Sequence, residues 1–410
     1  MTLLYTLLIH LLYALLLPVS LFSQKAALWV KGRKEWRSKL KQWEPVDFPR
    51  LWFHAASLGE FEQGLPVIEE LKKEYPHCSI LLTFFSPSGY EIRKNYSKAD
   101  CVIYLPLDTS YNAREFIRLA KPNAAFFIKY EFWYFYLREL YREGIPTYLI
   151  SARFRPGQIF FMPFAYWFRK KLSFFRHFFV QDQSSLDLLN KIGFNNVSVT
   201  GDTRFDRVIE NSTKAKRIEL AASFCSGYTS LIAGSTWPAD EKLLARYIEE
   251  SDVRMIIAPH ETDQRHISKL SQLTGNKSVL YSGAVQNGLN GEQVLIIDNM
   301  GMLSSLYTYG KIAYIGGGFG KGIHNILEAA VFGMPVIFGP NYSKFREAIE
   351  LIATGGAFAV GSFDELKTVM DKLTGSPQML ESASSRAKEY VLSNAGATAK
   401  ILDILKSEIL

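Results

Sequence analysis

The chain has 410 residues, of which 48% are hydrophobic and 21% are charged, so it holds enough apolar material for two or three folded domains and is not a disordered protein. Its 3 cysteines, Cys78, Cys101 and Cys225, lie far apart, which excludes a disulfide framework and a cysteine-based zinc cluster. The formal net charge of +7 suits nucleic acid, a membrane surface or an anionic substrate, so the position of the charge must decide between these partners.

The N-terminal region combines a long apolar run with a basic segment. Residues 3–22 are rich in Leu and Ile and include no charged residue, and a run of this length can span or deeply enter a bilayer. Residues 25–41 then carry seven basic side chains against Glu35 alone. A cleaved signal peptide has its basic residues before the apolar run, whereas here they follow it, which holds that flank in the cytoplasm beside anionic lipids.

We therefore predict a membrane anchor at 1–24 and a basic juxtamembrane segment at 25–41. A buried N-terminal hairpin helix is the alternative. Pro18 and His10 leave open whether the apolar run spans the bilayer or lies in one leaflet.

From Arg50 onward, short apolar runs without polar alternation alternate with stretches of helical periodicity. This pattern is typical of parallel strands that helices cover on both faces, and it begins again after a polar interval. We predict an α/β protein with two Rossmann-like domains that face each other across a cleft. The predicted segments are a first domain at 42–208, a linker at 209–225, a second domain at 226–395, and a closing helix at 396–410 that packs on either domain.

A glycine-rich loop within residues 314–340 is the most informative motif, because a strand ends there and a helix and a second strand follow. Glycines let the backbone approach a ligand, and a helix start offers free N–H groups to a phosphate. The loop is not a dinucleotide fingerprint, since Ile323 stands where a third glycine is needed, and not a Walker A loop, since Gly322 follows Lys321. Glu328, one turn into the helix, suits the hydroxyls of a ribose. A plain glycine turn with a surface glutamate is the alternative.

Three other segments of the second domain lie at the predicted carboxyl ends of strands, where open α/β sheets bind ligands. They are Gly234–Asp240, Pro259 with His260, and Met300-Gly301-Met302. For His260, a role as a strand-end capping residue fits the pattern as well as contact with a ligand.

The first predicted domain also has charged residues just after its predicted strands. Glu60 lies where residues 53–60 turn from a strand into a helix, so it suits a general base towards an acceptor hydroxyl or, alternatively, a carboxylate that stabilises the helix dipole. Glu131 follows another strand. Arg204, within residues 201–206, suits a bidentate contact with a carboxylate or phosphate, or else an interdomain salt bridge.

Residues 153–179 contain basic and aromatic side chains but no acidic residue. Such a mixture suits an interfacial surface that meets phosphorylated lipid, although nucleic acid is held by similar mixtures. The apolar N-terminus favours lipid. A buried pair of aromatic helices is the alternative.

Taken together, these motifs resemble the 3-deoxy-D-manno-octulosonic acid (Kdo) transferases of lipopolysaccharide synthesis, over nearly the whole chain. The motifs that carry the resemblance are Lys31-Gly-Arg-Lys34, His54-Ala-Ala-Ser-Leu-Gly-Glu60, Glu131-Phe-Trp133, Gly201-Asp-Thr-Arg-Phe-Asp206, Gly234-Ser-Thr236 and His324-Asn-Ile-Leu-Glu328.

The resemblance implies a GT-B-type glycosyltransferase that moves Kdo from CMP-Kdo to the lipid A precursor, lipid IVA, with inversion and without a metal or other cofactor. It implies attachment to the inner (cytoplasmic) membrane with the catalytic domains facing the cytoplasm, and no nucleic-acid partner; it predicts no oligomeric state. By the same resemblance, Glu60 is the proton acceptor, and Glu131 and Arg204 stabilise the transition state. The residues that would contact CMP are Pro259, His260, Met300, Gly301, Met302, Asn325, Ile326, Leu327 and Glu328.

The sequence departs from the family pattern at Ile323, where glycine is expected, and after Pro259, where His260-Glu-Thr-Asp263 replaces a frequent Arg-His-Pro. Two other functions remain open from the residues alone. One is a lipid-linked glycosyltransferase that uses a UDP-GlcNAc type of donor, and the other is a catalytically inactive, membrane-anchored binding protein.

Overall fold

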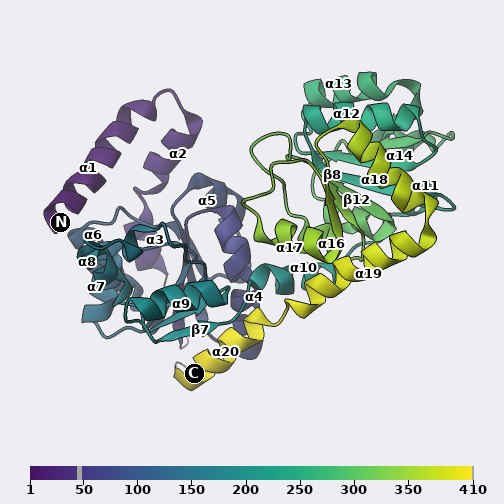
Figure 1. The fold of residues 1–410 in the computed structure, drawn as a ribbon. Helices are drawn as coiled ribbons and strands as arrows, with labels where there is room; N and C mark the ends of the chain where they lie inside the picture. The colour runs from purple at the N-terminus through teal and green to yellow at the C-terminus, as the bar shows by residue number, and fades with distance from the viewer. Residues whose placement is uncertain (44–48, 409–410) are drawn as a thin grey trace. The chain divides into compact units, whose positions relative to one another are not determined.

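The computed structural model describes residues 1–43 and 49–408, which divide into two compact units (Figure 1). Unit 1 comprises Met1–Arg207 and Ala395–Leu410, and unit 2 comprises Val208–Asn394. Each unit is built on one 7-stranded sheet, and all strand pairings are parallel. The prediction of an α/β chain with two Rossmann-like domains is confirmed. Residues 44–48, near the start of the predicted first domain, and 409–410, at the end of the predicted closing helix, lie outside the described residues.

The sheet of unit 1 has the order β3-β2-β1-β4-β5-β6-β7. Its strands are β1 (Arg50–Ala55), β2 (Ser79–Phe84), β3 (Cys101–Tyr104), β4 (Ala124–Ile128), β5 (Thr147–Ala152), β6 (His177–Val180) and β7 (Val197–Val199). The strand order reverses between β1 and β4. The loops that follow these two strands therefore flank the crevice in which open α/β sheets bind ligands.

Helices cover both faces of this sheet, which explains why its strands are apolar without alternation. Successive residues of β1 point to opposite faces, so Trp52 lies in one buried cluster and Phe53 in the other. The helices that follow the strands are α4 (Leu58–Glu74), α5 (Pro87–Arg93), α6 (Ser110–Ala120), α7 (Tyr134–Arg142), the 3₁₀ helix η1 (Ile159–Phe161), α8 (Tyr166–Leu172), α9 (Gln183–Lys191) and α10 (Thr203–Thr213).

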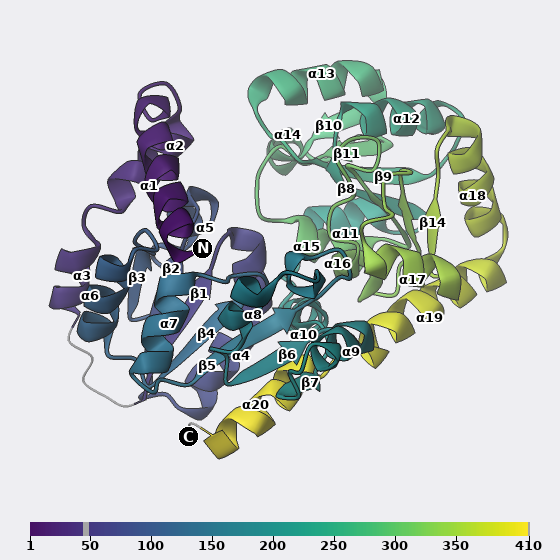
Figure 2. The ribbon, with the colours of Figure 1, turned by 60° about the vertical axis from the view of Figure 1, so that its left-hand side comes forward.

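The closing helix, α20 (Ala397–Glu408), packs on unit 1 beside α4 (Figures 1 and 2). Its Ile401, Leu402 and Leu405 are buried in the cluster that contains Phe53. The sequence left open on which domain this helix packs, because an amphipathic pattern shows which face is buried but not which surface covers it.

The N-terminal segment forms α1 (Thr2–Val19), α2 (Gln24–Gly32) and α3 (Trp36–Gln42). By length and composition, α1 is long and apolar enough to cross a membrane. Within the segment 153–179, Phe160, Phe174 and Phe175 are buried in the core, so much of this aromatic segment is interior, as the alternative interpretation held. Phe164 and Tyr166 remain exposed.

The sheet of unit 2 has the order β10-β11-β9-β8-β12-β13-β14, with its reversal between β8 and β12. Its strands are β8 (Ser230–Thr236), β9 (Arg254–Pro259), β10 (Ser278–Leu280), β11 (Val294–Ile296), β12 (Ile312–Ile315), β13 (Val336–Phe338) and β14 (Ala357–Ala359). A Cβ atom on Gly316 would lie 2.2 Å from the Ser235 carbonyl oxygen, so glycine permits the close approach of the two loops at the reversal.

The helices of unit 2 surround this sheet (Figure 2). They are α11 (Glu219–Cys225), α12 (Pro238–Glu249), α13 (Gln264–Thr274), the 3₁₀ helix η2 (Gly275–Lys277), α14 (Tyr281–Asn287), α15 (Leu303–Leu306), the 3₁₀ helix η3 (Tyr307–Tyr309), α16 (Leu327–Ala330), α17 (Arg346–Thr354), α18 (Phe363–Gly375) and α19 (Pro377–Ser393). The segment interpreted as a linker, 209–225, is largely helical, because α10 continues to Thr213 and α11 begins at Glu219.

Candidate functional site

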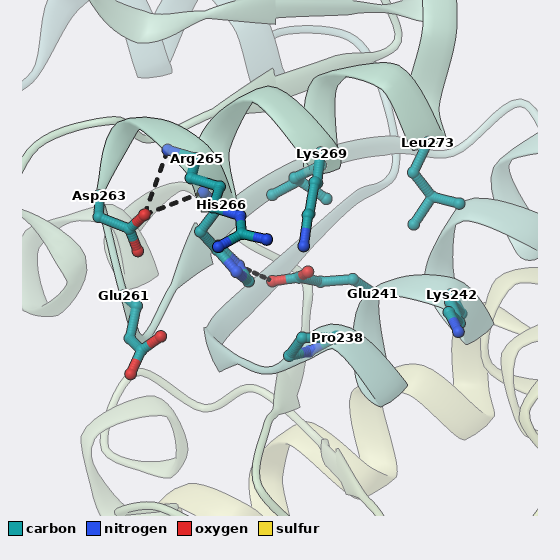
Figure 3. A pocket seen from close by; sticks show the side chains of 10 residues that line it. Pro238, Glu241, Lys242, Glu261, Asp263, Arg265, His266, Lys269 and Leu273 are labelled. Atoms are coloured by element: carbon teal, nitrogen blue, oxygen red, sulfur yellow. Dashed lines mark hydrogen bonds and ion pairs between the residues drawn. The ribbon is translucent and has the colours of Figure 1, made fainter.

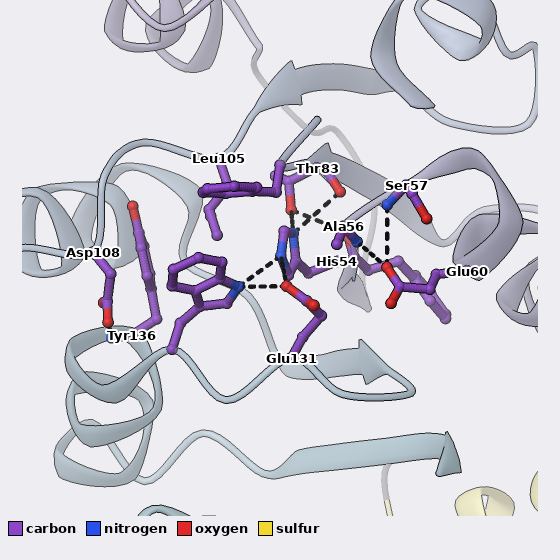
Figure 4. A network of polar contacts seen from close by, with 12 residues as sticks. His54, Ala56, Ser57, Glu60, Thr83, Leu105, Asp108, Glu131 and Tyr136 are labelled. Carbon is purple, nitrogen blue, oxygen red and sulfur yellow. Dashed lines mark hydrogen bonds and ion pairs between the residues drawn. The ribbon is translucent and has the colours of Figure 1, made fainter. Parts of the chain in front are cut away.

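Two predicted catalytic carboxylates lie at the strand-order reversal of unit 1. Glu60 is in the first turn of α4, after β1, and Glu131 follows β4, which pairs directly with β1. Parallel strands bring their following loops to the same edge of a sheet, so the topology gathers these residues although they are far apart in sequence (Figure 4).

Glu60 takes part in the capping of α4. Its Oε2 atom accepts hydrogen bonds from the backbone N–H groups of Ala56 at 2.8 Å and Ser57 at 3.1 Å, and Ser57 is the N-cap residue. One carboxylate oxygen of Glu60, Oε2, therefore stabilises the start of the helix, which is the alternative role considered from the sequence. Within residues 1–43 and 49–408, Oε1 accepts no hydrogen bond, so it is available to a substrate hydroxyl.

The surroundings of Glu60 favour its protonated form. Burial raises the pKa of its carboxyl group to about 7, and the negative charge of Glu131 acts in the same direction. The Ala56 N–H group, the Lys129 ammonium group and the Ser57 N–H group act in the opposite direction. A carboxylate that exchanges its proton near neutral pH has the acidity that a general base requires.

Glu131 is held by a buried polar network that crosses the sheet. Its Oε2 atom accepts a hydrogen bond from Trp133 Nε1 at 2.6 Å and lies 3.1 Å from His54 Nε2. On the other side of the ring, His54 Nδ1 lies 2.9 Å from Thr83 Oγ1, which accepts a hydrogen bond from Trp52 Nε1 at 2.9 Å. The contacts around His54 are drawn in Figure 4. The network fixes the orientation of Glu131 at the mouth of the crevice.

His54, Thr83 and Trp133 were not predicted as site residues. His54 and Trp133 belong to the motifs that carry the resemblance. The only sign of the buried network in the sequence is a histidine within an otherwise apolar strand. A buried polar ring needs partners, but the sequence does not tell which distant strand supplies them.

Lys129 is a further residue that the sequence did not single out. It follows β4 with φ of 71°, in the left-handed region that non-glycine residues rarely occupy. Ser235, at the reversal of unit 2, has φ of 53°. Backbone strain of this kind concentrates at functional sites, and here it occurs at the ligand-binding edge of both sheets.

Arg204 lies near the start of α10 and is paired with Asp202, whose Oδ2 accepts hydrogen bonds from Nε at 2.9 Å and lies 2.7 Å from Nη2. The neighbouring Thr203 donates a hydrogen bond from Oγ1 to the Gln63 carbonyl oxygen at 2.5 Å. Since Gln63 lies in α4 just beyond Glu60, α10 begins beside the helix that carries the predicted base. The role of Arg204 stays a prediction.

In unit 2, Asp240 ties together the two loops at the strand-order reversal. Its Oδ2 atom accepts hydrogen bonds from the N–H groups of Trp237 at 2.9 Å and Gly317 at 3.0 Å, and its Oδ1 atom accepts one from the Tyr314 hydroxyl at 2.8 Å. Asp240 is fully buried. The loop after β8 and the glycine-rich loop after β12 are thereby held as one surface.

Three rings stack on this surface. The His260 ring lies 4.7 Å from the Trp237 ring and 4.5 Å from the His324 ring, between centroids, and Trp237 Nε1 donates a hydrogen bond to His324 Nε2 at 3.0 Å. Burial lowers the pKa of His324, and the neighbouring His260 lowers it further, which favours the neutral acceptor. A hollow of about 560 Å³ opens beside the stack, and Phe319 and Lys321 of the glycine-rich loop also line it.

The backbone of His260 has the strand-end role considered from the sequence, and contact of its ring with a ligand stays a prediction. Its backbone N–H donates to the Thr236 carbonyl oxygen at 3.0 Å, as expected of a residue that closes a strand, while its exposed ring joins the stack. Pro259 ends β9 beside it.

The remaining predicted CMP contacts differ in exposure. Met300 is 76% exposed, Gly301 has φ of +88°, and Met302 precedes α15. Ile326 and Leu327 are fully buried, backbone atoms included. Asn325 Nδ2 donates a hydrogen bond to Glu328 Oε1 at 2.9 Å. That these residues bind CMP stays a prediction.

A second hollow, of about 570 Å³, lies between α12 and α13 (Figure 3). Figure 3 shows Glu241 and His266 pointing toward each other, with Glu241 Oε1 2.9 Å from His266 Nε2. Lys242, Arg265 and Lys269 also line this hollow, whereas no predicted site residue does. We assign it no substrate. Among the residues that the structure describes, no group of three His, Cys, Asp or Glu side chains is placed to hold a metal ion.

Comparison with known proteins identifies the family. Residues 31–207 match the family model described as 3-Deoxy-D-manno-octulosonic-acid transferase (kdotransferase). The 3-deoxy-D-manno-octulosonic acid transferase of Aquifex aeolicus (strain VF5) is 31% identical over 333 residues, which cover 79% of this chain and 85% of that protein. The chain belongs to the Kdo transferase family.

Other comparisons agree with this assignment. The Kdo transferase of Haemophilus influenzae (strain ATCC 51907 / DSM 11121 / KW20 / Rd) is 27% identical to this Kdo transferase over 378 residues, or 87% of this chain and 86% of that protein. The UDP-GlcNAc 2-epimerase from Neisseria meningitidis, solved with bound UDP-GlcNAc, superposes with a TM-score of 0.64 at 16% identity, covering 88% of this chain and 100% of that one. This likeness concerns the fold alone, and with the two parallel sheets it confirms the predicted GT-B-type fold.

Proposed function

We propose that this Kdo transferase moves Kdo from CMP-Kdo to the lipid A precursor, lipid IVA, in lipopolysaccharide synthesis. The transfer inverts the anomeric centre, uses no metal ion, and has Glu60 as its general base. The observation that carries the proposal is the position of Glu60, whose Oε1 atom is free of hydrogen bonds from the described residues and whose pKa is raised to about 7 by burial.

The chemistry that follows needs one proton acceptor and one anionic leaving group. Kdo is a keto-sugar acid, so its C2 atom carries a carboxylate and becomes oxocarbenium-like as CMP departs. Glu60 takes the proton of the primary hydroxyl of the glucosamine disaccharide while that oxygen forms a bond to C2. The bond between C2 and the phosphate oxygen breaks, and its electron pair leaves with CMP. Attack opposite the leaving group inverts the configuration.

The other predicted residues have supporting roles in this scheme. Glu131, held by His54 and Trp133, places negative charge near Glu60 and near the cationic sugar. Arg204 stabilises the transition state as the phosphate leaves. The CMP moiety is bound by unit 2, through Pro259 and His260 and the segments 300–302 and 325–328.

We further propose that α1 attaches the protein to the inner membrane, with both units in the cytoplasm. The support is the length and apolar composition of α1 and the basic segment that follows it. A water-insoluble acceptor such as lipid IVA gives an enzyme of this family a reason to lie at the membrane.

The direct test is transfer by membranes that contain the protein, supplied with CMP-Kdo generated in situ and a tetraacylated lipid A precursor, in the presence of EDTA. We expect a product heavier by one or more Kdo units, read by mass spectrometry. Product with Mg²⁺ but none with EDTA would overturn the metal-free mechanism. No product under either condition, with CMP binding intact, would overturn the proposed acceptor.

The family assignment favours Kdo transfer over the two functions left open by the residues alone. Competition separates them further, since we expect CMP to inhibit the reaction and UDP to inhibit it only weakly. Inhibition by UDP in place of CMP would point to a UDP-GlcNAc type of donor, and CMP binding without transfer to any acceptor would point to an inactive binding protein.

A further inference from the structure

The side chains of α1 are distributed in the opposite way to those of a water-soluble helix. A stripe spaced by three or four residues, including Thr2, Tyr5, Ile9 and Tyr13, is at least partly buried against the rest of unit 1. This inward stripe carries hydroxyl groups, whereas the outward surface is mainly leucine. The exposed leucines are Leu3, Leu4, Leu7, Leu8, Leu11, Leu12, Leu15 and Leu17. A surface helix in water has its polar residues outside, so this outward face requires an apolar medium.

The Thr2 end of α1 is docked on unit 1. The Tyr5 hydroxyl donates a hydrogen bond to Asp108 Oδ2 at 2.5 Å, and the Tyr5 ring lies 5.6 Å from the Trp167 ring of α8. The Lys171 ammonium group lies 4.7 Å from the centroid of the Tyr5 ring. Asp108 is buried and also accepts the backbone N–H of Phe135 at 3.1 Å, so the group that holds Tyr5 is itself fixed.

The chain then returns to unit 1 as a hairpin (Figure 1). After Val19 it turns at residues 20–23 and runs back as α2, with the Trp29 ring 6.4 Å from the Tyr13 ring. Just beyond α2, the buried Arg33 donates hydrogen bonds to the carbonyl oxygens of Leu105 at 2.9 Å and Phe85 at 2.5 Å. Both ends of the hairpin are therefore attached to unit 1.

This arrangement decides between the two membrane topologies that the sequence left open. A helix of 18 residues is about 27 Å long, so if α1 crossed the bilayer its Thr2 end would lie on the face opposite unit 1. The contact between Tyr5 and Asp108 excludes that position. Insertion of the hairpin by its tip would place the charged Lys25 side chain in the hydrocarbon, which is unfavourable.

We propose that α1 is a monotopic anchor, which lies along one leaflet with its leucine face among the acyl chains and remains docked on unit 1 through Tyr5 and Asp108. This inference rests on the membrane location proposed above. Two neighbouring features of unit 1 also suit contact with a lipid leaflet. Phe164 and Tyr166 are exposed close to Trp167, and exposed basic side chains are available to anionic head groups. The basic residues are Lys25, Lys31, Lys34, Arg155 and Lys170.

The test is a distance measurement in native membranes. In a background in which Cys78, Cys101 and Cys225 are replaced by Ala, one variant carries Thr2→Cys with Trp167→Cys, and its matched control carries Leu15→Cys with Trp167→Cys. Thr2 Oγ1 lies 3.4 Å from Trp167 Nε1, whereas Leu15 is more than two helical turns further along α1. Both variants are treated with a short bis-maleimide, and the share of protein in the membrane fraction is measured in parallel.

We expect the Thr2 variant to cross-link at least several-fold faster than the Leu15 variant in the membrane fraction. A helix that crosses the bilayer brings its Leu15 end nearer to unit 1, so faster cross-linking from Leu15 would overturn the proposal. Membrane-bound protein that cross-links from neither position would also overturn it. Protein found only in the soluble fraction would refute the membrane location itself, a result distinct from the other two.

A second pair of variants tests the contact between Tyr5 and Asp108 by itself. In the Thr2→Cys, Trp167→Cys background, Tyr5→Phe removes only the hydroxyl that reaches Asp108, and Tyr13→Phe removes the corresponding hydroxyl of a tyrosine that packs on Trp29. We expect Tyr5→Phe to slow the cross-link several-fold and Tyr13→Phe to leave it unchanged. Equal effects of the two substitutions would contradict a dock at Asp108.

Discussion

His54 Nε2 lies 3.1 Å from Glu131 Oε2, beneath the crevice where the strand order of unit 1 reverses. With a proton on Nε2, His54 donates to Glu131 and accepts at Nδ1 from the Thr83 hydroxyl, 2.9 Å away. A fully buried histidine thus links a core threonine to a carboxylate at the ligand-binding edge. We interpret His54 as a positioning residue that fixes Glu131.

The first prediction concerns this link. We expect His54→Leu to lower kcat about tenfold or more with little change in KM, because Glu131 loses a donor that sets its orientation. The buried Thr83 hydroxyl loses one partner but keeps its hydrogen bonds with Trp52 and the Phe53 carbonyl oxygen. Unfolding should therefore become easier by about 0.5–1.5 kcal/mol, the net contribution of one hydrogen bond. His54→Gln, which keeps a side-chain donor, should recover much of kcat. Steady-state kinetics and thermal melts measure both effects, and equal kcat values for the two variants would contradict a positioning role.

The second prediction concerns pH. Because burial raises the pKa of Glu60 to about 7, and the base must be deprotonated to act, kcat/KM should rise with pH through about 7. Glu131→Gln removes a charge that raises this pKa, so the rise should move to lower pH. Lys129→Gln removes a charge that lowers the pKa, so the rise should move to higher pH.

The control for these shifts is Lys98→Gln, which removes an exposed positive charge elsewhere on unit 1. Its pH profile should match that of the unmodified protein. Shifts of the same sign in the Glu131 and Lys129 variants would refute Glu60 as the titrating base.

Much of the fold follows from the order of short apolar runs and helical stretches, which the sequence displays directly. The positions of Glu60, Glu131 and the glycine-rich loop also follow, because a residue just after a strand lies at the ligand edge of a parallel sheet. The residues that contact them cannot be predicted from the sequence in the same way. Thr83 meets His54 only because β2 pairs with β1, and the left-handed φ of Lys129 carries no sequence signal.

The aromatic segment 153–179 could be predicted only in part from the sequence. Its basic and aromatic composition suggests a surface, and Phe164 and Tyr166 are indeed exposed. However, Phe160, Phe174 and Phe175 belong to the core. Elements as short as η1 and α8 offer too few turns for a periodic pattern to separate an inner from an outer face.

A third prediction concerns stability. Burial raises the pKa of Asp108 from 3.8 to about 6, so the folded state binds this proton more tightly than the unfolded state does. The stabilising contribution is complete below about 3.8 and is lost as the pH rises through about 6. The difference in Tm between Asp108→Asn and the unmodified protein should therefore move in favour of the variant between pH 4.5 and 7. A difference that does not change with pH would contradict this.

The fourth prediction concerns the ring stack of unit 2. His260→Ala removes an exposed ring that stacks on both Trp237 and His324. We expect the affinity for CMP to fall about fivefold or more, as for a lost stacking contact of about 1 kcal/mol. Isothermal titration calorimetry with CMP measures the change. Lys367→Ala, on α18, is the control and should bind CMP normally. If His260→Ala bound CMP with unchanged affinity, His260 would not be part of the nucleotide-binding site.

The central claim is that Glu60 is the general base, and Glu60→Gln tests it most directly. Glutamine at this position keeps a side-chain oxygen that accepts the N–H groups of Ala56 and Ser57, so α4 retains its cap. Kdo transfer to the lipid A precursor, measured by product mass, should fall about 10²–10⁴-fold or below detection, with CMP binding and Tm unchanged. Full transfer by Glu60→Gln would contradict the account.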